Sequence, residues 1–514
     1  MKPNALSRTL SPTGNAPIPV IALAVLGLIL GSCGRGGLVT DSADGEAEYR
    51  TSLTADGRGI AYRPPSMGWK PLGIDALPSY DPAKTESFQV DLRKRDVSSL
   101  DLSGRLADLL KADFDSGTRW PDRLPDGFDP SLIMELGKNP GLGVRALHKE
   151  GIVGTGVGIA VIDQALLVDH VEYKDRLRLY EEIHCGDGRA AMHGAAVASI
   201  AVGKSAGVAP GADLYYIGET SGTREDGGFT YDFTHLARAI ERVLKVNRRL
   251  PAGEKIRVIA IAQGWVAVSK GSAEAARAVA RAVKGGVFVV SSSLFETSGR
   301  RFAFSGLGRE PTADPDKPGS FGPGLWWANS FYRGRHKPAP DIEPLLVPMD
   351  SRTPAGFNGP EDYAFYRQGG LSWAIPWVAG LYALACQVRP DVTPELFWRT
   401  ALATGDSLEL PPRDAPLTEE EIERRVPEAV EKAMAQVMAG LRRQGDGADP
   451  EKYLADFHNY FTGKKLTKMT EAEFRAWEAG YVREGLAAIG KPVVLEKIVN
   501  PLKLMAALRK GEAR

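Results

Sequence analysis

The chain has 514 residues, of which 43% are hydrophobic and 25% are charged. Its 64 basic and 64 acidic residues balance, so the charge gives no reason to expect nucleic acid as a partner. This length and composition predict a large globular core with smaller appendages.

The N-terminus differs in kind from the rest of the chain. Lys2 and Arg8 precede an apolar run over residues 18–30, and the sequence Leu-Gly-Ser-Cys follows, ending at Cys33. The apolar run is short for a permanent membrane span, so it predicts a cleaved export signal over residues 1–33. Its end resembles the lipobox of bacterial lipoproteins, which implies lipidation at Cys33, a membrane anchor and an extracytoplasmic location. A plain secretory signal with an incidental cysteine is the alternative.

Residues 34–130 offer no recognisable chemistry. Residues 34–47 are rich in Gly, Asp and Ser, which predicts a tether. Weak strand and helix patterns follow, for example at residues 102–110, between proline-rich breaks. This part is either a prosegment or a permanent N-terminal extension, and the sequence leaves both open.

From residue 151 onward, buried strands alternate with helices, which predicts an α/β fold with a doubly wound, mostly parallel sheet flanked by helices. One strand is expected over residues 157–162, directly before Asp163. Catalytic groups in such sheets gather at the carboxyl edge of the strands. The domain built on this sheet is predicted to span residues 131–410. Further strands are expected over residues 212–217, 256–262 and 286–290, and helices over residues 195–202, 233–246 and 273–283.

The segment at residues 369–380 reads GGLSWAIPWVAG and predicts a buried helix that begins at Ser372. Pro376 suits the first turn of a helix, where its missing N–H has no partner in any case. A hydroxyl at a helix N-terminus lies where backbone N–H groups and the helix dipole stabilise negative charge, as an acyl-transfer nucleophile requires. Taken alone, a serine in this position is more often only a helix cap.

Asp163 follows a strand, His193 starts one helix and Ser372 starts another, in the chain order found in subtilisin. The surrounding sequences agree with this order. GIAVIDQALLVDH resembles the aspartate motif of subtilases, HGAAVASIAVGKSAGVAPGADLY the histidine motif, and GGLSWAIPWVAGLYALACQVRPDVTPELF the serine motif. Over residues 139–410 the chain therefore resembles the subtilisin-like (S8) serine peptidases.

The resemblance implies a serine endopeptidase acting on a peptide or protein substrate through a catalytic triad. Ser372 is the implied nucleophile, His193 the general base and then acid, and Asp163 the group that orients the imidazole. Gly264, in the sequence AQGW, matches the glycine that pairs with the substrate backbone. This chemistry requires no cofactor and no metal, and the sequence leaves open whether calcium stabilises the fold.

The chain departs from the family at the oxyanion hole. Phe295 stands where the family has an asparagine that donates to the oxyanion, and Leu371 replaces the threonine before the nucleophile. The Ser372 N–H remains, with Ser293, Thr297 or Asn329 as candidate substitutes for the missing donors. Loss of one such donor in subtilisin slows turnover on the order of 100- to 1,000-fold. The alternative function is therefore a catalytically weak or inactive subtilase-fold protein that binds peptides or regulates a partner.

Several other residues are expected to have structural roles and no part in catalysis. His170 lies downstream of the aspartate motif and is expected to serve packing, as are the flanking tryptophans of the nucleophile, Trp373 and Trp377. No HExxH sequence or cysteine pair suggests zinc. Cys185 and Cys386 either form a disulfide or remain buried thiols.

The C-terminal part is predicted to be helical. Capping boxes at Thr418 with Glu421 and at Thr470 with Glu473 predict two helix starts in an insertion over residues 411–490. Pro427 is expected to interrupt the first of these helices. Residues 491–514 resemble the closing helix of subtilases, which makes the helical part an insertion into the catalytic domain.

Overall fold

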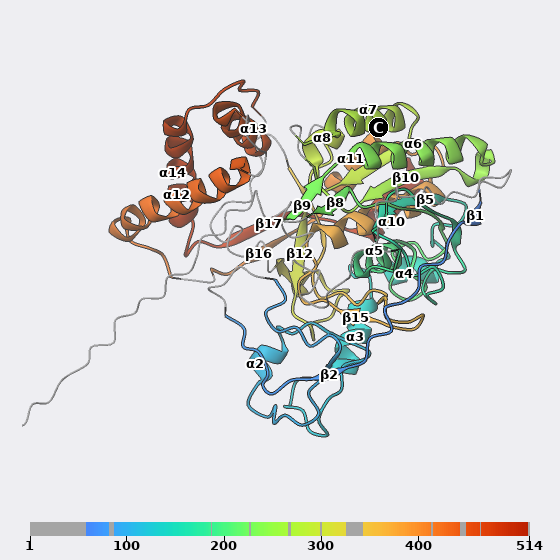
Figure 1. Cartoon of the computed structure of the whole chain (residues 1–514), viewed down its shortest axis with the longest axis horizontal. Helices are drawn as coiled ribbons and strands as arrows, with labels where there is room; N and C mark the ends of the chain where they lie inside the picture. Colours follow the sequence, from blue (N-terminus) through green and yellow to red (C-terminus); the bar gives the residue numbers. More distant parts are fainter. Residues whose placement is uncertain are drawn as a thin grey trace, which may run out of the picture.

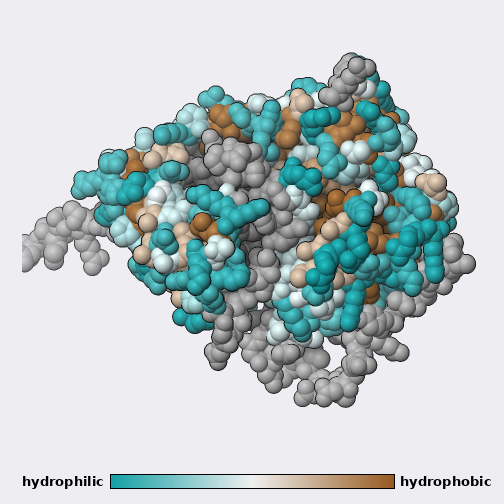
Figure 2. Space-filling model, turned by 90° about the horizontal axis from the view of Figure 1, so that it is seen from above, coloured by the Kyte–Doolittle hydropathy of each residue, from teal (hydrophilic) through white to brown (hydrophobic). Residues whose placement is uncertain are grey.

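The computed structural model describes residues 58–81, 87–186, 188–225, 228–265, 269–298, 301–324, 343–412, 415–442, 449–462 and 464–511. Cys33, the predicted signal and the predicted tether lie outside the described residues. On the face seen in Figure 2, hydrophobic residues lie in small groups among hydrophilic ones, as on most protein surfaces.

A six-stranded sheet forms the centre of the protein, with the spatial order β1-β6-β7-β5-β10-β11 (Figure 1). Every pair of neighbouring strands in it is parallel. The predicted α/β fold with a mostly parallel sheet is therefore confirmed. Its strands are β1 (Gly59–Ile60), β5 (Gly158–Asp163), β6 (Leu177–Glu182), β7 (Asp213–Gly218), β10 (Ile256–Ile261) and β11 (Phe288–Ser291).

Helices cover both faces of this sheet. On β5, Ile159 and Val161 face one core cluster and Ala160 and Ile162 face another, because successive side chains of a strand point to opposite sides. The first cluster contains α5 (Met192–Val202) and α10 (Leu371–Val388), and the second contains α6 (Thr234–Arg249) and α7 (Ser272–Lys284). Although α10 is long and apolar enough to cross a membrane, it is mostly buried, as expected of a core helix.

The predicted strands and helices of this unit agree with the observed ones to within a few residues, but β6 was not predicted. Its sequence, LRLYEE, contains an arginine and two glutamates and so lacks the continuous apolar run expected of a buried strand. The Glu181 side chain is nevertheless buried, and it accepts hydrogen bonds of 2.6 and 2.7 Å from Arg242 on α6. Because the buried residue is a glutamate paired with an arginine, a search for hydrophobic runs does not detect this strand.

A second, five-stranded sheet lies beside the first, with the order β13-β12-β14-β17-β16. Its strands come from distant parts of the chain, so no local pattern in the sequence predicts this sheet. They are β12 (Phe304–Arg309), β13 (Phe321–Pro323), β14 (Leu345–Pro348), β16 (Asp406–Leu410) and β17 (Val493–Ile498). Smaller elements near the two sheets are β8 (Gly222–Glu225), β9 (Gly228–Tyr231), η1 (Ala252–Glu254), α8 (Leu294–Ser298), η2 (Pro318–Ser320) and α11 (Pro394–Thr404).

The N-terminal part folds against the body that contains the central sheet. Its cluster of buried residues includes Leu92, Phe114 and Phe128, and also Phe365 from the segment before α10. The short elements here are β2 (Leu72–Gly73), β3 (Arg95–Asp96), α2 (Leu106–Leu109) and β4 (Phe114–Asp115), which pairs with β15 (Ala364–Phe365). The helices α3 (Pro130–Lys138) and α4 (Val144–Lys149) lead into β5.

The C-terminal helices lie to one side of the body in Figure 1. They are α12 (Glu419–Arg442), α13 (Pro450–Thr462) and α14 (Glu471–Ala487), between the paired strands β16 and β17, and α15 (Pro501–Lys510) follows. The chain thus leaves the second sheet for these helices and returns to it. Both predicted capping boxes form, since Glu421 and Glu473 accept from the backbone N–H of Thr418 and Thr470.

The expected interruption at Pro427 is wrong, because α12 continues through it. A proline inside a helix removes one backbone hydrogen bond and normally destabilises the helix. Here Ile422 and Val430, on either side of the proline, pack in one cluster with Val482 and Leu486 of α14. This packing holds both halves of α12 in line.

Candidate active site

The carboxylate of Asp163 lies at the carboxyl end of the central strand β5. The Asp163 side chain is buried, and its Oδ1 accepts a hydrogen bond of 2.8 Å from the N–H of Gln164. The same oxygen lies 2.7 Å from Nδ1 of His193. The carboxylate is therefore held in place by its own strand end and directed at the imidazole.

His193 occupies the first turn of α5, and the glycine after it allows the helix to approach the sheet. A Cβ on Gly194 would lie 2.4 Å from the Tyr216 hydroxyl and 2.6 Å from the carbonyl oxygen of Gln164. Tyr216 itself donates a hydrogen bond of 2.5 Å to that carbonyl. Only glycine lets the start of α5 come this close to the ends of β5 and β7.

Ser372 lies in the first turn of α10, which begins at Leu371, one residue earlier than predicted. Gly370, before the helix, has a φ of 66°, a backbone conformation that favours glycine. Pro376 lies inside α10, so its placement in the first turn was wrong. Because a proline has no N–H to give to the residue four positions before it, Ser372 O loses its regular partner in the helix.

Asp163 ends β5, and His193 and Ser372 lie in the first turns of α5 and α10, two helices that pack on the same face of the sheet. The indole of Trp373, next to the serine, lies with its ring centroid 5.5 Å from that of the His193 imidazole. The hydroxyl of Ser372 donates to the carbonyl oxygen of Ala262 at 3.2 Å. The hydroxyl is thus directed at a carbonyl oxygen and not at His193; bonds between a nucleophile and its base are often long or absent until substrate binds.

The segment after β10 contains the predicted substrate glycine, Gly264. It starts at Ala262, the hydrogen-bond partner of Ser372, and continues to Trp265. The Ser293 hydroxyl accepts from the N–H of Trp265 at 2.5 Å and donates to its carbonyl oxygen at 2.6 Å. Gly264 is therefore fixed between the proposed nucleophile and the end of β11.

Ser293 and Thr297, two of the candidate oxyanion donors, have other hydrogen-bond partners. The Ser293 proton goes to Trp265, and the Thr297 hydroxyl donates to the Ser293 carbonyl oxygen at 2.7 Å. Both hydroxyl protons are therefore directed at backbone carbonyl oxygens in this structure. Asn329 and the side chain of Phe295 lie outside the described part of the chain, while the backbone of Phe295 belongs to α8.

The backbone of α10 supplies what remains of a donor set. Ser372 occupies the second helical position, where a backbone N–H has no acceptor within the helix. The positive end of the helix dipole lies at the same place. A developing oxyanion above Ser372 would thus meet one N–H group and a favourable field.

A buried carboxyl group next to this site was not predicted. Glu219 directly follows β7, and its N–H donates to the carbonyl oxygen of Asp163 at 2.7 Å. Its carboxylate accepts from Gln263 Nε2 at 2.9 Å and from the Ser221 hydroxyl at 2.8 Å. Burial raises the pKa of Glu219 to about 8, and these hydrogen bonds oppose the rise. The available signal was a glutamate directly after an apolar run, the same signal that identified Asp163.

His170, Trp373 and Trp377, which were expected to serve packing, are all buried. His170 is buried; its Nδ1 accepts from the N–H of Glu172 at 3.1 Å, and its Nε2 donates to the carbonyl oxygen of Asp362 at 2.7 Å. Trp377 is buried and donates to Pro140 O at 2.9 Å, and Trp373 is buried beside His193. The role expected for these residues, packing, is supported by these contacts.

The two cysteines are thiols that no disulfide joins. Cys386 is buried in α10, and burial raises its pKa to about 11, so it is a poor nucleophile. Cys185 is half-buried after β6. Among the described residues, no three His, Cys, Asp or Glu side chains are placed to hold a metal ion.

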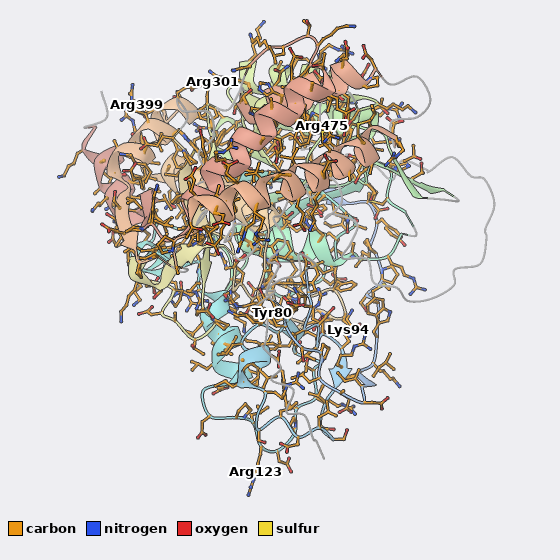
Figure 3. The ribbon with its side chains drawn as sticks, turned by 90° about the vertical axis from the view of Figure 1, so that its left-hand side faces the viewer. Tyr80, Lys94, Arg123, Arg301, Arg399 and Arg475 are labelled. Carbon is orange, nitrogen blue, oxygen red and sulfur yellow. The ribbon has the colours of Figure 1, made fainter. Side chains whose placement is uncertain are left out.

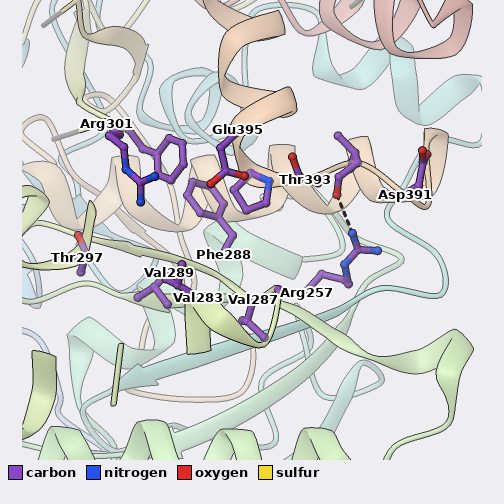
Figure 4. Close-up of a pocket in the computed structure, with 14 residues that line it drawn as sticks. Arg257, Val283, Val287, Phe288, Val289, Thr297, Arg301, Asp391, Thr393 and Glu395 are labelled. Atoms are coloured by element: carbon purple, nitrogen blue, oxygen red, sulfur yellow. Dashed lines mark hydrogen bonds between the residues drawn. The ribbon is translucent and has the colours of Figure 1, made fainter. Parts of the chain in front are cut away.

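A pocket of about 280 Å³ lies at the other end of β11, between α7 and the start of α11 (Figure 4). Its lining includes Phe288, Thr297 and Glu395, and Arg257, which donates to the carbonyl oxygen of Val392 at 2.8 Å. None of the predicted triad residues contributes to this lining. The pocket is therefore separate from the candidate active site.

The comparisons with solved structures give distant likenesses. The prenylagaramide maturation protease PagA is 18% identical, with 54% of this chain and 90% of that chain covered and a TM-score of 0.35. The self-cleaved protease domain of PatA is 19% identical, with 49% of this chain and 88% of that chain covered and a TM-score of 0.34. No curated protein matches this chain.

A family comparison bears on the site more directly. The matched region contains Asp163, His193 and Gly264, and it ends before Ser372. It also covers five of the six strands of the central sheet, all except β1. Residues 154–294 of this chain match the family model described as the subtilase family, Peptidase_S8.

Proposed function

We propose that this protein is a serine endopeptidase that hydrolyses peptide bonds through Asp163, His193 and Ser372. The observation that carries the proposal is the 2.7 Å contact between Asp163 Oδ1 and His193 Nδ1, at the sheet edge where α10 presents Ser372. Since Nδ1 donates to the carboxylate, Nε2 of the neutral ring is the nitrogen that accepts a proton. The subtilase match over residues 154–294 supports the same assignment.

In the proposed reaction, the Ser372 hydroxyl turns from Ala262 to His193 and attacks the scissile carbonyl carbon. His193 Nε2 takes the serine proton, and the carbonyl oxygen gains the negative charge near the Ser372 N–H. His193 then gives that proton to the leaving amine as the C–N bond breaks, which leaves an acyl-serine. Water, deprotonated by His193, hydrolyses this ester and restores the serine.

The substrate backbone is proposed to pair with the segment from Ala262 to Trp265. An extended peptide gains main-chain hydrogen bonds by adding to such a segment, and its side chains supply specificity. Gly264 has no side chain to obstruct this approach. The two bonds between Ser293 and Trp265 hold the segment in place before the substrate arrives.

Labelling with a serine-directed phosphonate tests this function. We expect wild type to be phosphonylated at Ser372, Ser372→Ala to lose the label, and Ser103→Ala, at an exposed serine remote from α10, to label as wild type does. Peptide mapping identifies the labelled residue. If wild type remains unlabelled under conditions in which a control subtilase reacts, the endopeptidase assignment is wrong.

A second candidate function follows from the oxyanion region. Phe295 and Leu371 lack side-chain donors, and the hydroxyls of Ser293 and Thr297 are already used. These features favour a catalytically weak or inactive protein that binds peptides or regulates a partner. Binding of a peptide library to wild type without any cleavage, together with no phosphonate label, would support this function over hydrolysis.

We also propose that the protein is anchored outside the cytoplasm through a lipid on Cys33. The support is the basic start, the apolar run over residues 18–30 and the small residues before Cys33. In a bacterial host, we expect labelled palmitate to be incorporated into wild type but not into Cys33→Ala. Equal incorporation into both proteins would exclude this anchor.

A further inference from the structure

The N-terminal extension, defined here as residues 58–128, is built into the catalytic body. Its strand β1 pairs with β6 and forms one edge of the central sheet, with Gly59 opposite Leu179 and Ile60 opposite Tyr180. The N–H of Ala61 continues this pairing with a bond of 2.9 Å to Tyr180 O. In Figure 3 most of the extension lies in the lower part of the molecule, where Tyr80, Lys94 and Arg123 are labelled.

A second connection joins the extension to the segment that leads into α10. Strand β4 pairs antiparallel with β15, with Phe114 opposite Phe365 and Asp115 opposite Ala364. The rings of Phe114 and Phe365 lie 5.1 Å apart, centroid to centroid, and both are buried. Because β15 lies just before Gly369 and Gly370, the extension supports the chain directly ahead of Ser372.

Arg367 makes polar contacts across this connection. Its N–H donates to Asp113 Oδ1 at 2.8 Å, and its Nε donates to Leu110 O at 3.0 Å. Both acceptors belong to the extension, and the side chains of Asp113 and Arg367 are buried. Loss of such a buried acceptor leaves a backbone N–H unsatisfied, so this contact fixes the backbone at residue 367.

Aromatic contacts continue from the extension to the triad. The guanidinium of Arg93 lies 4.6 Å from the ring centroid of Phe88 and 5.0 Å from that of Tyr366. Tyr366 contacts Trp373 edge to face at 5.3 Å, and Trp373 lies 5.5 Å from the His193 ring. A continuous set of packed side chains thus links Arg93 of the extension to His193.

Because two glycines precede Ser372, the direction of the chain into α10 depends on this packing. A Cβ on Gly369 would lie 2.3 Å from Cδ1 of Trp373, so the chain passes directly against the indole. Gly370 then turns the chain into α10 with a φ of 66°. Since glycine restricts its own backbone least of all residues, the direction of this turn depends on the anchors on either side.

We propose that the N-terminal extension is retained in the mature enzyme and positions the nucleophile, with Asp113 and Arg93 as positioning residues. They hold Tyr366 and Arg367, and through these the start of α10, in register with His193. The inference rests on the proposed peptidase function. A removable prosegment would take with it the edge strand β1 and the partners of Phe365 and Arg367, which argues against removal.

The first test compares three variants of the full chain. Asp113→Ala removes the acceptor of the Arg367 N–H, while Asp113→Asn keeps an acceptor oxygen in the same place. Ser116→Ala is the matched control, because Ser116 also accepts from a backbone N–H of this segment, that of Tyr363 at 3.0 Å, but farther from Ser372. The rate of phosphonate labelling, kcat and KM are measured at a temperature where all variants are folded.

Asp113→Ala is expected to lower kcat and the labelling rate about 10- to 100-fold with little change in KM, because small displacements of a nucleophile cost this much. Asp113→Asn is expected to restore most of the rate, and Ser116→Ala to retain it. Equal rates in wild type and Asp113→Ala would overturn the positioning role while leaving the peptidase assignment intact. A wild type that does not label would overturn both.

The second test does not depend on any variant folding. The phosphonylated protein is purified from the cells that make it, and its peptides are mapped. We expect peptides from residues 58–128 to remain, covalently joined to the catalytic body, in the labelled molecule. A labelled enzyme whose chain starts after residue 128 would show that the extension is removed and would overturn the proposal.

Discussion

Asp163 Oδ1 lies 2.7 Å from Nδ1 of His193. The same oxygen also accepts a hydrogen bond of 2.8 Å from the Gln164 N–H, so the backbone next to Asp163 helps to hold the carboxylate in place. Two elements that are far apart in the sequence, the end of β5 and the start of α5, therefore meet in one defined hydrogen bond. It sets both the tautomer of His193 and the direction of its Nε2.

This relationship predicts the effect of Asp163→Asn. An asparagine side chain can turn its amide toward Nδ1, which makes Nε2 the protonated nitrogen and prevents it from accepting the serine proton. We expect kcat to fall on the order of 10,000-fold, as in serine proteases with this replacement. Steady-state cleavage of a peptide substrate measures it. Asp169→Asn, at the exposed partner of Arg63, should retain the wild-type rate.

Gly194→Ala tests the close approach of α5 to the sheet. The new methyl group would lie 2.4 Å from the Tyr216 hydroxyl, so the start of α5 has to shift and His193 moves with it. We expect a loss of stability of about 1–3 kcal/mol, as for other overpacked sites, and slower labelling of Ser372. Denaturant unfolding and phosphonate labelling report the two effects.

Gly480→Ala serves as the opposite control for that substitution. Gly480 lies in α14, and a Cβ there meets no atom within 4 Å. Replacing a helical glycine by alanine should therefore increase stability by about 0.5–1 kcal/mol and leave labelling unchanged. If both glycine variants lost the same stability, the steric explanation for Gly194 would be wrong.

Glu219 predicts a pH dependence of stability. Burial raises its pKa from 4.5 to about 8, so between these values the folded state holds a proton that the unfolded state releases. The free energy of unfolding then falls as pH rises through this window, by at most about 1.4 kcal/mol per pH unit. Glu219→Gln mimics the protonated form and should remove this contribution.

The measurement compares unfolding midpoints of wild type and Glu219→Gln at pH 6 and pH 9. We expect the stability of Glu219→Gln relative to wild type to increase from pH 6 to pH 9, because wild type loses stability as the pH rises to about 8 and the variant does not. Glu409→Gln, at an exposed position on β16, should differ from wild type equally at both values. A Glu219→Gln variant that loses stability at pH 9 would show that the carboxylate is stabilised in the fold.

Phe295→Asn tests whether the missing oxyanion donor limits turnover. The residue follows β11 in the first turn of α8, and the family has its amide donor at the equivalent sequence position. Restoring that amide should increase kcat on the order of 100-fold, the effect of one such donor in subtilisin. Leu294→Asn, next to it, is the matched control and should not be faster than wild type. No increase in Phe295→Asn would mean that the local backbone directs the side chain elsewhere.

The sequence alone predicted the parallel sheet, the helices on its faces and the ends where Asp163, His193 and Ser372 lie. These features are local, because an apolar run of strand length followed by a polar residue, or a helical pattern after a glycine, is visible in a short window. Strand β6 was not predicted, because its buried Glu181 looks like a surface residue in the sequence. Its partner, Arg242, belongs to another element. Pro427 was misjudged for a similar reason, since α14 holds α12 together.

The sequence by itself determined the fold class and the candidate nucleophile, base and carboxylate, whose signals lie in their own neighbourhoods. Only the tertiary structure decided that the Ser293 hydroxyl belongs to Trp265, that Glu219 is buried beside Asp163, and that Asp113 holds the N–H of Arg367. Each of these depends on a hydrogen bond or packing contact between separate segments. Such partners leave no periodic trace in the sequence, because they are chosen by the folded geometry and not by the residues on either side.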